Sequence, residues 1–364
     1  MKRMAILLAA GAVSLSVFAG CSAKPVTAAP EGGASGDTVK IGLNYELSGD
    51  VASYGQASVA GIKLAAQEIN DAGGINGKKI ELIEYDTKSD TAEATTLATK
   101  LMAQDKVLTV IGPATSGGMK AQIQVAEKNQ VPIVSGSSTA DDLTVTNGKV
   151  NEYVFRTCFN DSFQGTSAAN YSTEKLGAKT AVIIKDNSND YSKGLAASFD
   201  AQFKANGGTI VAEEAYAKGE RNFNSILTKI KGQSFDVIYL PGYYEEAGPA
   251  IKQARELGIT APILGADGYD SPKLAEAAGA GLTDVYFTNH YSSEDTDPKV
   301  VEFIAAFNKA NGEDPNAFNA LGYDTMKFVA DAVSRATELT GPAVKDAMAA
   351  TKDFAGVTGT FSVD

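Results

Sequence analysis

The stretch "TVIGPATSGGMK", residues 109–120, contains an apolar strand, a turn rich in small and polar residues, and the start of a helix. Such a turn directs free backbone N–H groups outward, and the helix dipole favours negative charge in front of them. The turn is not a Walker phosphate loop, because the Gly-Lys-Ser/Thr ending is missing and Lys120 comes too late in the helix. The stretch therefore predicts a strand of a parallel sheet with an anion site at its carboxyl end.

The same alternation of strand and helix continues along the chain. Apolar strand patterns occur at 39–45, 79–85, 107–112, 132–136, 153–158, 180–186, 209–216, 236–242, 261–267 and 284–290, with helical patterns between them. The roughly 330 residues involved exceed what one hydrophobic core usually holds. We therefore predict an α/β fold of two doubly wound parallel-sheet lobes joined by a hinge, with the ligand beyond the carboxyl ends of the strands.

The first residues predict export. Lys2 and Arg3 precede an apolar run that ends in small residues before Cys21, so residues 1–20 are interpreted as a signal peptide too short to span a membrane. "VFAGC", 17–21, resembles a bacterial lipobox, which predicts a thioether-linked diacylglycerol on Cys21. The alternative is an ordinary signal peptide with Cys21 in a disulfide; the other cysteine is Cys158. Residues 21–37 are predicted to be the lipidated Cys and a flexible tether.

Composition argues against several classes of function. The 44 acidic side chains outnumber the 32 basic ones, which argues against nucleic acid as a partner. His290 is the only histidine, so neither a catalytic triad nor a zinc site is visible. "DNSNDYSKG", 186–194, starts like a calcium loop but lacks its turn glycine and its final glutamate. We therefore expect that the protein is not an enzyme and that it binds neither a metal ion nor a cofactor.

Polar and aromatic residues follow several predicted strands: Ser116, then Ser137, Ser138 and Thr139, then Tyr191, Tyr243 and Asp267. Singly, each has an ordinary structural explanation as a helix cap, a packed ring or a turn residue. Together they are complementary, because hydroxyls with helix N–H groups bind a carboxylate, Asp267 on the other sheet binds an ammonium group, and tyrosine rings pack an apolar side chain. The combination predicts a site for a zwitterionic α-amino acid.

Residues 38–364 resemble the type I solute-binding proteins of ABC importers, within the branched-chain amino-acid-binding (Leu/Ile/Val) group and closest to Gram-positive lipoprotein forms. The resemblance is carried, in family order, by "GLNYELSGDVASYGQASVAGIKLAAQEINDAGGINGKKIEL", "VIGPATSGG", "VPIVSGSST", "FRTCFNDSFQG", "DYSKGLAASF", "PGYYEEAG" and "GADGYD". It implies the periplasmic-binding-protein type I fold.

The resemblance also implies one role for each site residue. Ser116 matches the carboxylate-binding serine, and Ser137, Ser138 and Thr139 match a second turn that holds the same carboxylate and the ammonium group. Asp267 matches the acidic partner of the ammonium group, where Leu/Ile/Val binders often have the longer Glu. Tyr54, Tyr191 and Tyr243 match the aromatic walls of the pocket. The chain ends at "VTGTFSVD", 357–364, where the family normally continues, so we expect a shortened C-terminus.

The family fold implies interlobe crossings near 157–160, 287–291 and 355–361. Lobe one is then 38–157 plus 289–354, and lobe two is 158–288 plus 355–364. A ligand held by both lobes would favour closure of the hinge. The resemblance implies a monomeric, lipid-anchored protein on the extracytoplasmic face of the membrane that passes Leu, Ile or Val to ABC permease subunits. The alternatives are another amino acid, an amide or an aromatic acid as ligand, or a ligand-sensing module of the same fold.

Overall fold

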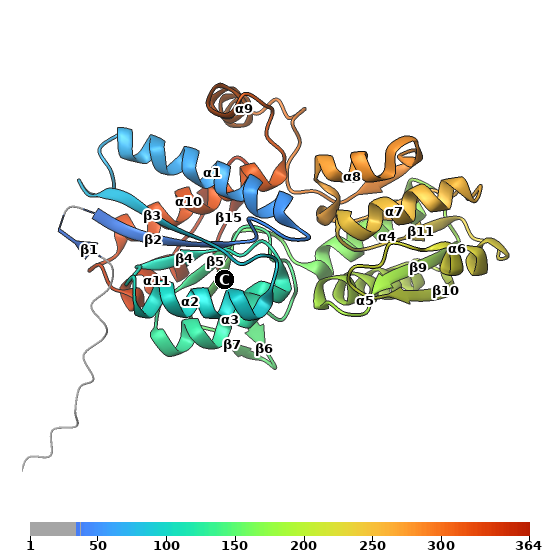
Figure 1. Cartoon of the computed structure of the whole chain (residues 1–364), viewed down its shortest axis with the longest axis horizontal. Helices are drawn as coiled ribbons and strands as arrows, with labels where there is room; N and C mark the ends of the chain where they lie inside the picture. Colours follow the sequence, from blue (N-terminus) through green and yellow to red (C-terminus); the bar gives the residue numbers. More distant parts are fainter. Residues whose placement is uncertain (1–33, 37) are drawn as a thin grey trace, which may run out of the picture.

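The computed structural model describes residues 34–36 and 38–364, so the predicted signal peptide and Cys21 lie outside the described residues. Two lobes stand side by side, and each is a parallel sheet covered by helices on both faces (Figure 1). The predicted fold class is confirmed. None of the helices in the described part of the chain is long and apolar enough to cross a membrane.

The first sheet contains the parallel strands β2 (Thr38–Tyr45), β3 (Lys79–Asp86), β4 (Thr109–Ile111), β5 (Ile133–Ser135) and β8 (Val154–Arg156). β2 lies between β3 and β4, and the order continues through β5 to β8. The short strand β1 (Ala34–Ser35) pairs antiparallel with β2, so these two residues are not part of a free tether as predicted. The Lys78 ammonium group also donates to the Gly36 carbonyl, which holds this segment against the lobe.

Helices α2 (Thr91–Ala103) and α3 (Ser116–Asn129) cover one face of the first sheet, and α1 (Ala52–Asp71), α10 (Ala317–Arg335) and α11 (Gly341–Ala349) cover the other (Figure 1). α1 and α10 approach very closely, since a Cβ atom at Gly61 would lie 1.9 Å from the Asn319 carbonyl oxygen and one at Gly322 would lie 2.2 Å from that of Ser58. A small hairpin, β6 (Val145–Thr146) and β7 (Lys149–Val150), extends below this lobe.

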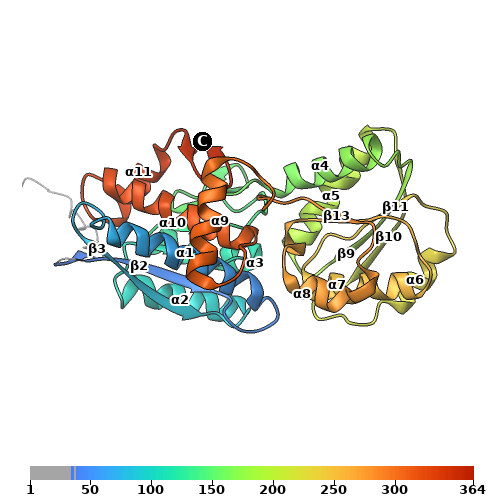
Figure 2. The ribbon, with the colours of Figure 1, turned by 90° about the horizontal axis from the view of Figure 1, so that it is seen from above.

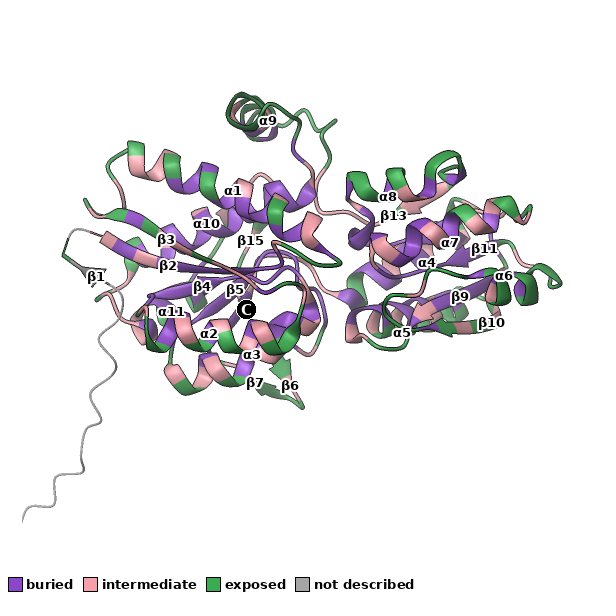
Figure 3. Ribbon diagram, in the orientation of Figure 1, coloured by how far each residue is buried: buried purple, intermediate pink, exposed green. Residues whose placement is uncertain are grey.

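The second sheet is wholly parallel, in the order β10 (Thr209–Tyr216), β9 (Thr180–Asp186), β11 (Val237–Tyr239), β12 (Ile263–Gly265) and β13 (Val285–Phe287). It is covered by α4 (Asp161–Glu174), α5 (Asp190–Ala205), α6 (Asn224–Lys231), α7 (Tyr244–Glu256) and α8 (Pro272–Ala278), with 3-10 turns at Asp267–Tyr269 and Gly279–Gly281. The central strands β4, β5, β11 and β12 are buried, the outer strands β3, β10 and β13 are partly exposed, and the helices expose one face (Figure 3).

The chain passes between the lobes at 157–160, after β8, and again at 288–297, between β13 and α9 (Pro298–Asn311), as Figure 2 shows from above. The C-terminal hairpin, β14 (Phe354–Ala355) and β15 (Thr360–Phe361), packs both phenylalanine rings against Phe328 of α10. The N–H groups of Val357 and Thr358 donate to the buried Asp324 carboxylate of the same helix. The assignment of 355–364 to lobe two, with a third crossing at 355–361, is therefore wrong, because this segment buries its rings against lobe one.

Candidate functional site

A small cavity of about 10 Å³ lies between the lobes, at the carboxyl ends of both sheets. This is far below the roughly 300–1,000 Å³ of pockets for drug-sized molecules, so the lobes must part to admit a ligand. Its walls come from both lobes: Tyr54, Ala114, Thr115, Ser116, Ser137, Tyr191, Tyr243, Asp267, Gly268 and Phe318. Of the predicted site residues, all but Ser138 and Thr139 line it.

The turn that opens α3 is shaped by Glu46, which sequence analysis did not select. The buried carboxylate of Glu46 accepts the N–H groups of Ala114 at 2.9 Å and Thr115 at 3.1 Å. The Thr115 side chain caps the helix by accepting from the Gly118 N–H. Within the described residues, the N–H groups of Ser116 and Gly117 form no hydrogen bond. The helix thus keeps two free donors in its first turn, which begins with the cavity-lining residue Ser116, after Glu46 has satisfied the donors just before them.

The second turn is bonded to the first. The Ser137 hydroxyl donates to the Ala114 carbonyl at 3.0 Å. The Ser138 hydroxyl faces the Pro113 and Ala114 carbonyls, each at 3.2 Å, and accepts from Ser135. Ser138 therefore joins the two turns and does not face the cavity. The Ser116 hydroxyl, in contrast, lines the cavity and accepts the Ala140 N–H at 3.1 Å.

Asp267 provides the negative charge of the second lobe. Its Oδ1 accepts from the Tyr191 hydroxyl at 2.6 Å and from the Gln164 amide at 3.0 Å. Its Oδ2 lies 3.1 Å from Nε2 of His290. Burial, and then the Asp267 carboxylate, raise the pKa of Tyr191 well above its ordinary value, so the phenol remains a donor. Gln164 and His290 were not among the predicted site residues, although His290 was considered for catalysis.

Aromatic rings form the apolar walls. Tyr54 stacks on Phe318 at 4.4 Å and meets Tyr243 edge-on at 5.7 Å, while Tyr243 stacks on Tyr191 at 5.1 Å. The Tyr54 hydroxyl donates to the Gly268 carbonyl at 2.5 Å and so joins the two lobes. Phe318 was not predicted, because a phenylalanine within an amphipathic helix looks like any core residue.

Asp161, the first residue of α4, adds a second buried carboxyl group. Neither of its oxygens has a hydrogen-bond partner among the described residues, and the same holds for the Thr139 hydroxyl. The Asp161 N–H donates to the Thr139 carbonyl at 2.9 Å. Burial raises the pKa of Asp161 to about 8, and Asp267 adds to this while the Thr139 hydroxyl opposes it. Asp161 therefore resists ionisation in the folded protein.

The site supplies donors for an anion on one lobe, an acidic acceptor on the other and aromatic walls between them. Among the described residues, no group of three or more His, Cys, Asp or Glu side chains could hold a metal ion. This set of groups is suited to holding a small zwitterion with an apolar part.

A family model described as periplasmic binding protein matches residues 38–364. The leucine-, isoleucine-, valine-, threonine-, and alanine-binding protein of Pseudomonas aeruginosa is 30% identical over 329 residues, which is 90% of this chain and 86% of that protein.

Similar solved structures are also amino-acid-binding proteins. The branched-chain amino acid transporter substrate binding protein LivJ from Streptococcus pneumoniae, in complex with isoleucine, is 45% identical with a TM-score of 0.85, over 90% of this chain and 92% of that one. The leucine binding protein LivK from Thermotoga maritima is 33% identical with a TM-score of 0.84, over 90% and 91% of the two chains.

Proposed function

Because this chain belongs to the periplasmic binding protein family, we propose that it captures a branched-chain amino acid, Leu, Ile or Val, between its lobes and delivers it to an ABC importer. Its role is then binding and not catalysis. The observation that carries the proposal is the position of anion donors on one lobe and of Asp267 on the other, around one cavity with aromatic walls.

The α-carboxylate is assigned to the first lobe. The Ser116 hydroxyl and the free N–H groups of Ser116 and Gly117 bind it, with support from the helix dipole of α3. Thr139 is not assigned to the ligand, because it does not line the cavity. Ser138 is assigned to the turn, because its hydroxyl already contacts two carbonyl groups.

The ammonium group and the side chain are assigned mainly to the second lobe and the aromatic walls. Asp267 accepts from the ammonium group in a charge-assisted hydrogen bond. The rings of Tyr54, Tyr243 and Phe318 cover an aliphatic side chain, and each buried CH₂ group contributes about 0.8 kcal/mol. This favours Leu, Ile or Val over smaller amino acids.

Capture and closure are one event in this proposal. A ligand that touched one lobe alone would not shift the equilibrium between open and closed forms, since only differential contacts do so. An amino acid gains its second set of contacts only when the segments 157–160 and 288–297 bring the lobes together. We accordingly assign 38–157 and 298–364 to lobe one and 161–287 to lobe two.

The cellular location follows from the family and from the N-terminus. The family is extracytoplasmic. The lipobox-like residues 17–21 support a lipid anchor at Cys21, and the resemblance to Gram-positive lipoproteins supports the cell surface and a monomer. Labelling with a fatty-acid probe should modify the wild-type protein and leave Cys21→Ser unmodified.

Titration calorimetry with each of the twenty amino acids tests the function. We expect micromolar or tighter binding of Leu, Ile or Val. A protein that released no heat with any of them would not have this function. Genes for permeases and ATPases beside this one would favour transport, whereas an adjacent histidine kinase gene would favour sensing.

A further inference from the structure

His290 lies on the second segment between the lobes and is the only histidine of the chain. Its side chain is 4% exposed, and Nε2 lies 3.1 Å from Oδ2 of Asp267. Because a carboxylate oxygen only accepts hydrogen bonds, Nε2 carries the hydrogen. A buried imidazole thus donates to the acidic residue of the proposed amino acid site, from the side of the hinge.

The oxygens of Asp267 show what this donation does. Oδ1 accepts two hydrogen bonds, from Tyr191 and Gln164. Oδ2 accepts only the one from His290 among the described residues. A carboxylate has about four lone-pair sites, so the open one is on Oδ2, the oxygen that His290 holds. Rotation about the terminal bond of an aspartate is otherwise broad, and His290 restricts it.

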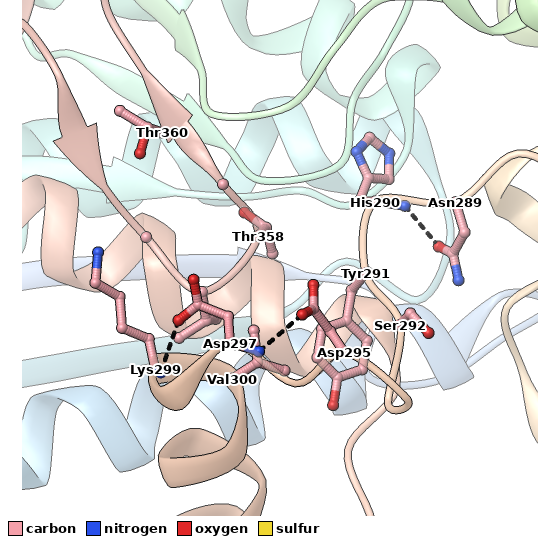
Figure 4. A pocket seen from close by; sticks show the side chains of 13 residues that line it. Asn289, His290, Tyr291, Ser292, Asp295, Asp297, Lys299, Val300, Thr358 and Thr360 are labelled. Carbon is pink, nitrogen blue, oxygen red and sulfur yellow. Dashed lines mark hydrogen bonds between the residues drawn. The ribbon is translucent and has the colours of Figure 1, made fainter.

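The imidazole is itself fixed by both segments between the lobes. Its ring stacks on Phe159 of the first segment, with ring centres 3.6 Å apart and planes 14° apart. The backbone N–H of His290 donates to Oδ1 of Asn289 at 2.9 Å, as drawn in Figure 4. The position of the ring therefore depends on the arrangement of the hinge.

We propose that His290 is a positioning residue that aims Oδ2 of Asp267 at the ammonium group of the ligand. The inference rests on the proposed amino acid binding and adds a residue to it. Since His290 lies on one hinge segment and stacks on Phe159 of the other, the ammonium contact is correctly aimed only when these segments are in their closed arrangement. The imidazole thereby links the hinge to the acidic side of the site.

The test uses two variants that separate the ring from the donor. His290→Phe keeps a ring for stacking on Phe159 but has no donor, and His290→Gln keeps an N–H donor but has no aromatic ring. With L-leucine in calorimetry, we expect His290→Phe to weaken binding by about tenfold or more, and His290→Gln to remain within about threefold of wild type. Tyr291→Phe is the matched control next in the chain, with unchanged affinity.

Nuclear magnetic resonance gives a second readout, because one histidine gives one imidazole signal. In the wild-type protein we expect the nitrogen chemical shifts of a histidine with its hydrogen on Nε2, and a change of these shifts when leucine is added. In Asp267→Asn we expect a mixture of the two tautomers of His290. Wild-type affinity in His290→Phe, or equal losses in His290→Phe and His290→Gln, would overturn the inference and leave the proposed function standing.

The proposed function can also fail while the link between His290 and Asp267 stands. If the wild-type protein binds no amino acid, the proposed function is wrong. An imidazole signal that still depends on Asp267 would then support the link between the two residues, whereas a signal that does not change in Asp267→Asn would overturn it. The same signal decides the question if His290→Phe does not fold.

Discussion

Lys120 of α3 and Asp190 of α5 form an ion pair of 2.7 Å that joins the two lobes outside the ligand cavity. Lys120 also lies 2.6 Å from Asp142 in its own lobe, and Asp190 lies 2.8 Å from Lys193 in its own helix. The pKa of Asp190 is lowered by Lys120 first and by Lys193 second. This charge cluster adds contacts that exist only when the lobes are together.

The pair predicts a salt-dependent affinity. Exposed ion pairs contribute about 0.2–1 kcal/mol, so Lys120→Met should weaken ligand binding by about two- to fivefold. Added salt should weaken ligand binding by the wild-type protein and have little effect on ligand binding by Lys120→Met, as calorimetry at low and high salt would show. Lys193→Met is the control, because Lys193 contacts Asp190 within one helix. Equal salt dependence in all three proteins would contradict a role in closure.

Asp267 predicts the largest loss of affinity. Asp267→Asn keeps the shape of the side chain but removes the charge opposite the ammonium group, so we expect affinity to fall by about 100-fold or more, as buried charge pairs cost roughly 2–5 kcal/mol when one partner is removed. Circular dichroism should show a folded protein. Glu276→Gln, on the exposed side of α8, should bind normally. Retained affinity in Asp267→Asn would show that the ammonium group lies elsewhere.

The two serines predict different phenotypes. Ser116→Ala should weaken binding by about tenfold, since it removes a hydroxyl that lines the cavity, and should also lower the free energy of unfolding by about 1 kcal/mol, since the Ala140 N–H loses its acceptor. Ser138→Ala should lower the free energy of unfolding by about 1 kcal/mol, because its hydroxyl holds the Pro113 and Ala114 carbonyls. Calorimetry and thermal melts of both variants check this. An affinity loss confined to Ser138→Ala would reverse the two assignments.

Asp161 predicts a pH dependence of stability. Burial raises its pKa from 3.8 to about 8 in the folded protein, so the folded state resists ionisation. The stability that this group contributes is therefore complete below about pH 4 and is lost progressively until the pH passes about 8. Asp161→Asn, which cannot ionise, should melt above wild type by a margin that grows by at most about 1.4 kcal/mol per pH unit between pH 5 and about pH 8 and then levels off.

Asp236 provides a control of opposite sign. The backbone N–H group of Lys179 is the main cause that holds the pKa of this carboxyl below its usual range. Its contribution is present above its unfolded pKa of about 4 and is lost as the pH falls through the lower folded value. Asp236→Asn should therefore melt below wild type at pH 5 to pH 9 by a constant margin. A constant margin for Asp161→Asn as well would contradict the raised pKa of Asp161.

The sequence was sufficient for the fold class and for most of the cavity. Strands of a parallel sheet all end at one edge, so Ser116 and Ser137 could be placed together on the first sheet, and Tyr191 and Asp267 on the second. That the two edges face each other was implied only by the resemblance to the family. Gln164 and Phe318 could not be found in this way, because both lie within helices, where a buried polar or apolar side chain resembles ordinary packing. Glu46 follows a strand but was not recognised, because its partners are the backbone N–H groups of Ala114 and Thr115 and the Thr115 hydroxyl, and none of these indicates an acidic partner from the sequence.

The tail shows the limit of reasoning by resemblance. The family pattern placed 355–364 on the second lobe, but the position of this segment depends on Phe354 and Phe361 meeting Phe328 and on two backbone N–H groups meeting Asp324. These contacts join residues about thirty positions apart in the chain. Local pattern and composition contain no record of them.

The close approach of α1 and α10 gives Gly61 an influence far from its own surroundings. α1 begins beside the cavity with Tyr54, about two turns from Gly61, and α10 carries Phe318 near its start. A methyl group at position 61 would meet the Asn319 carbonyl and wedge the two helices apart, and with them the stacked rings at their ends. Gly61→Ala, although buried away from the ligand, should therefore shift the rings that contact a leucine side chain.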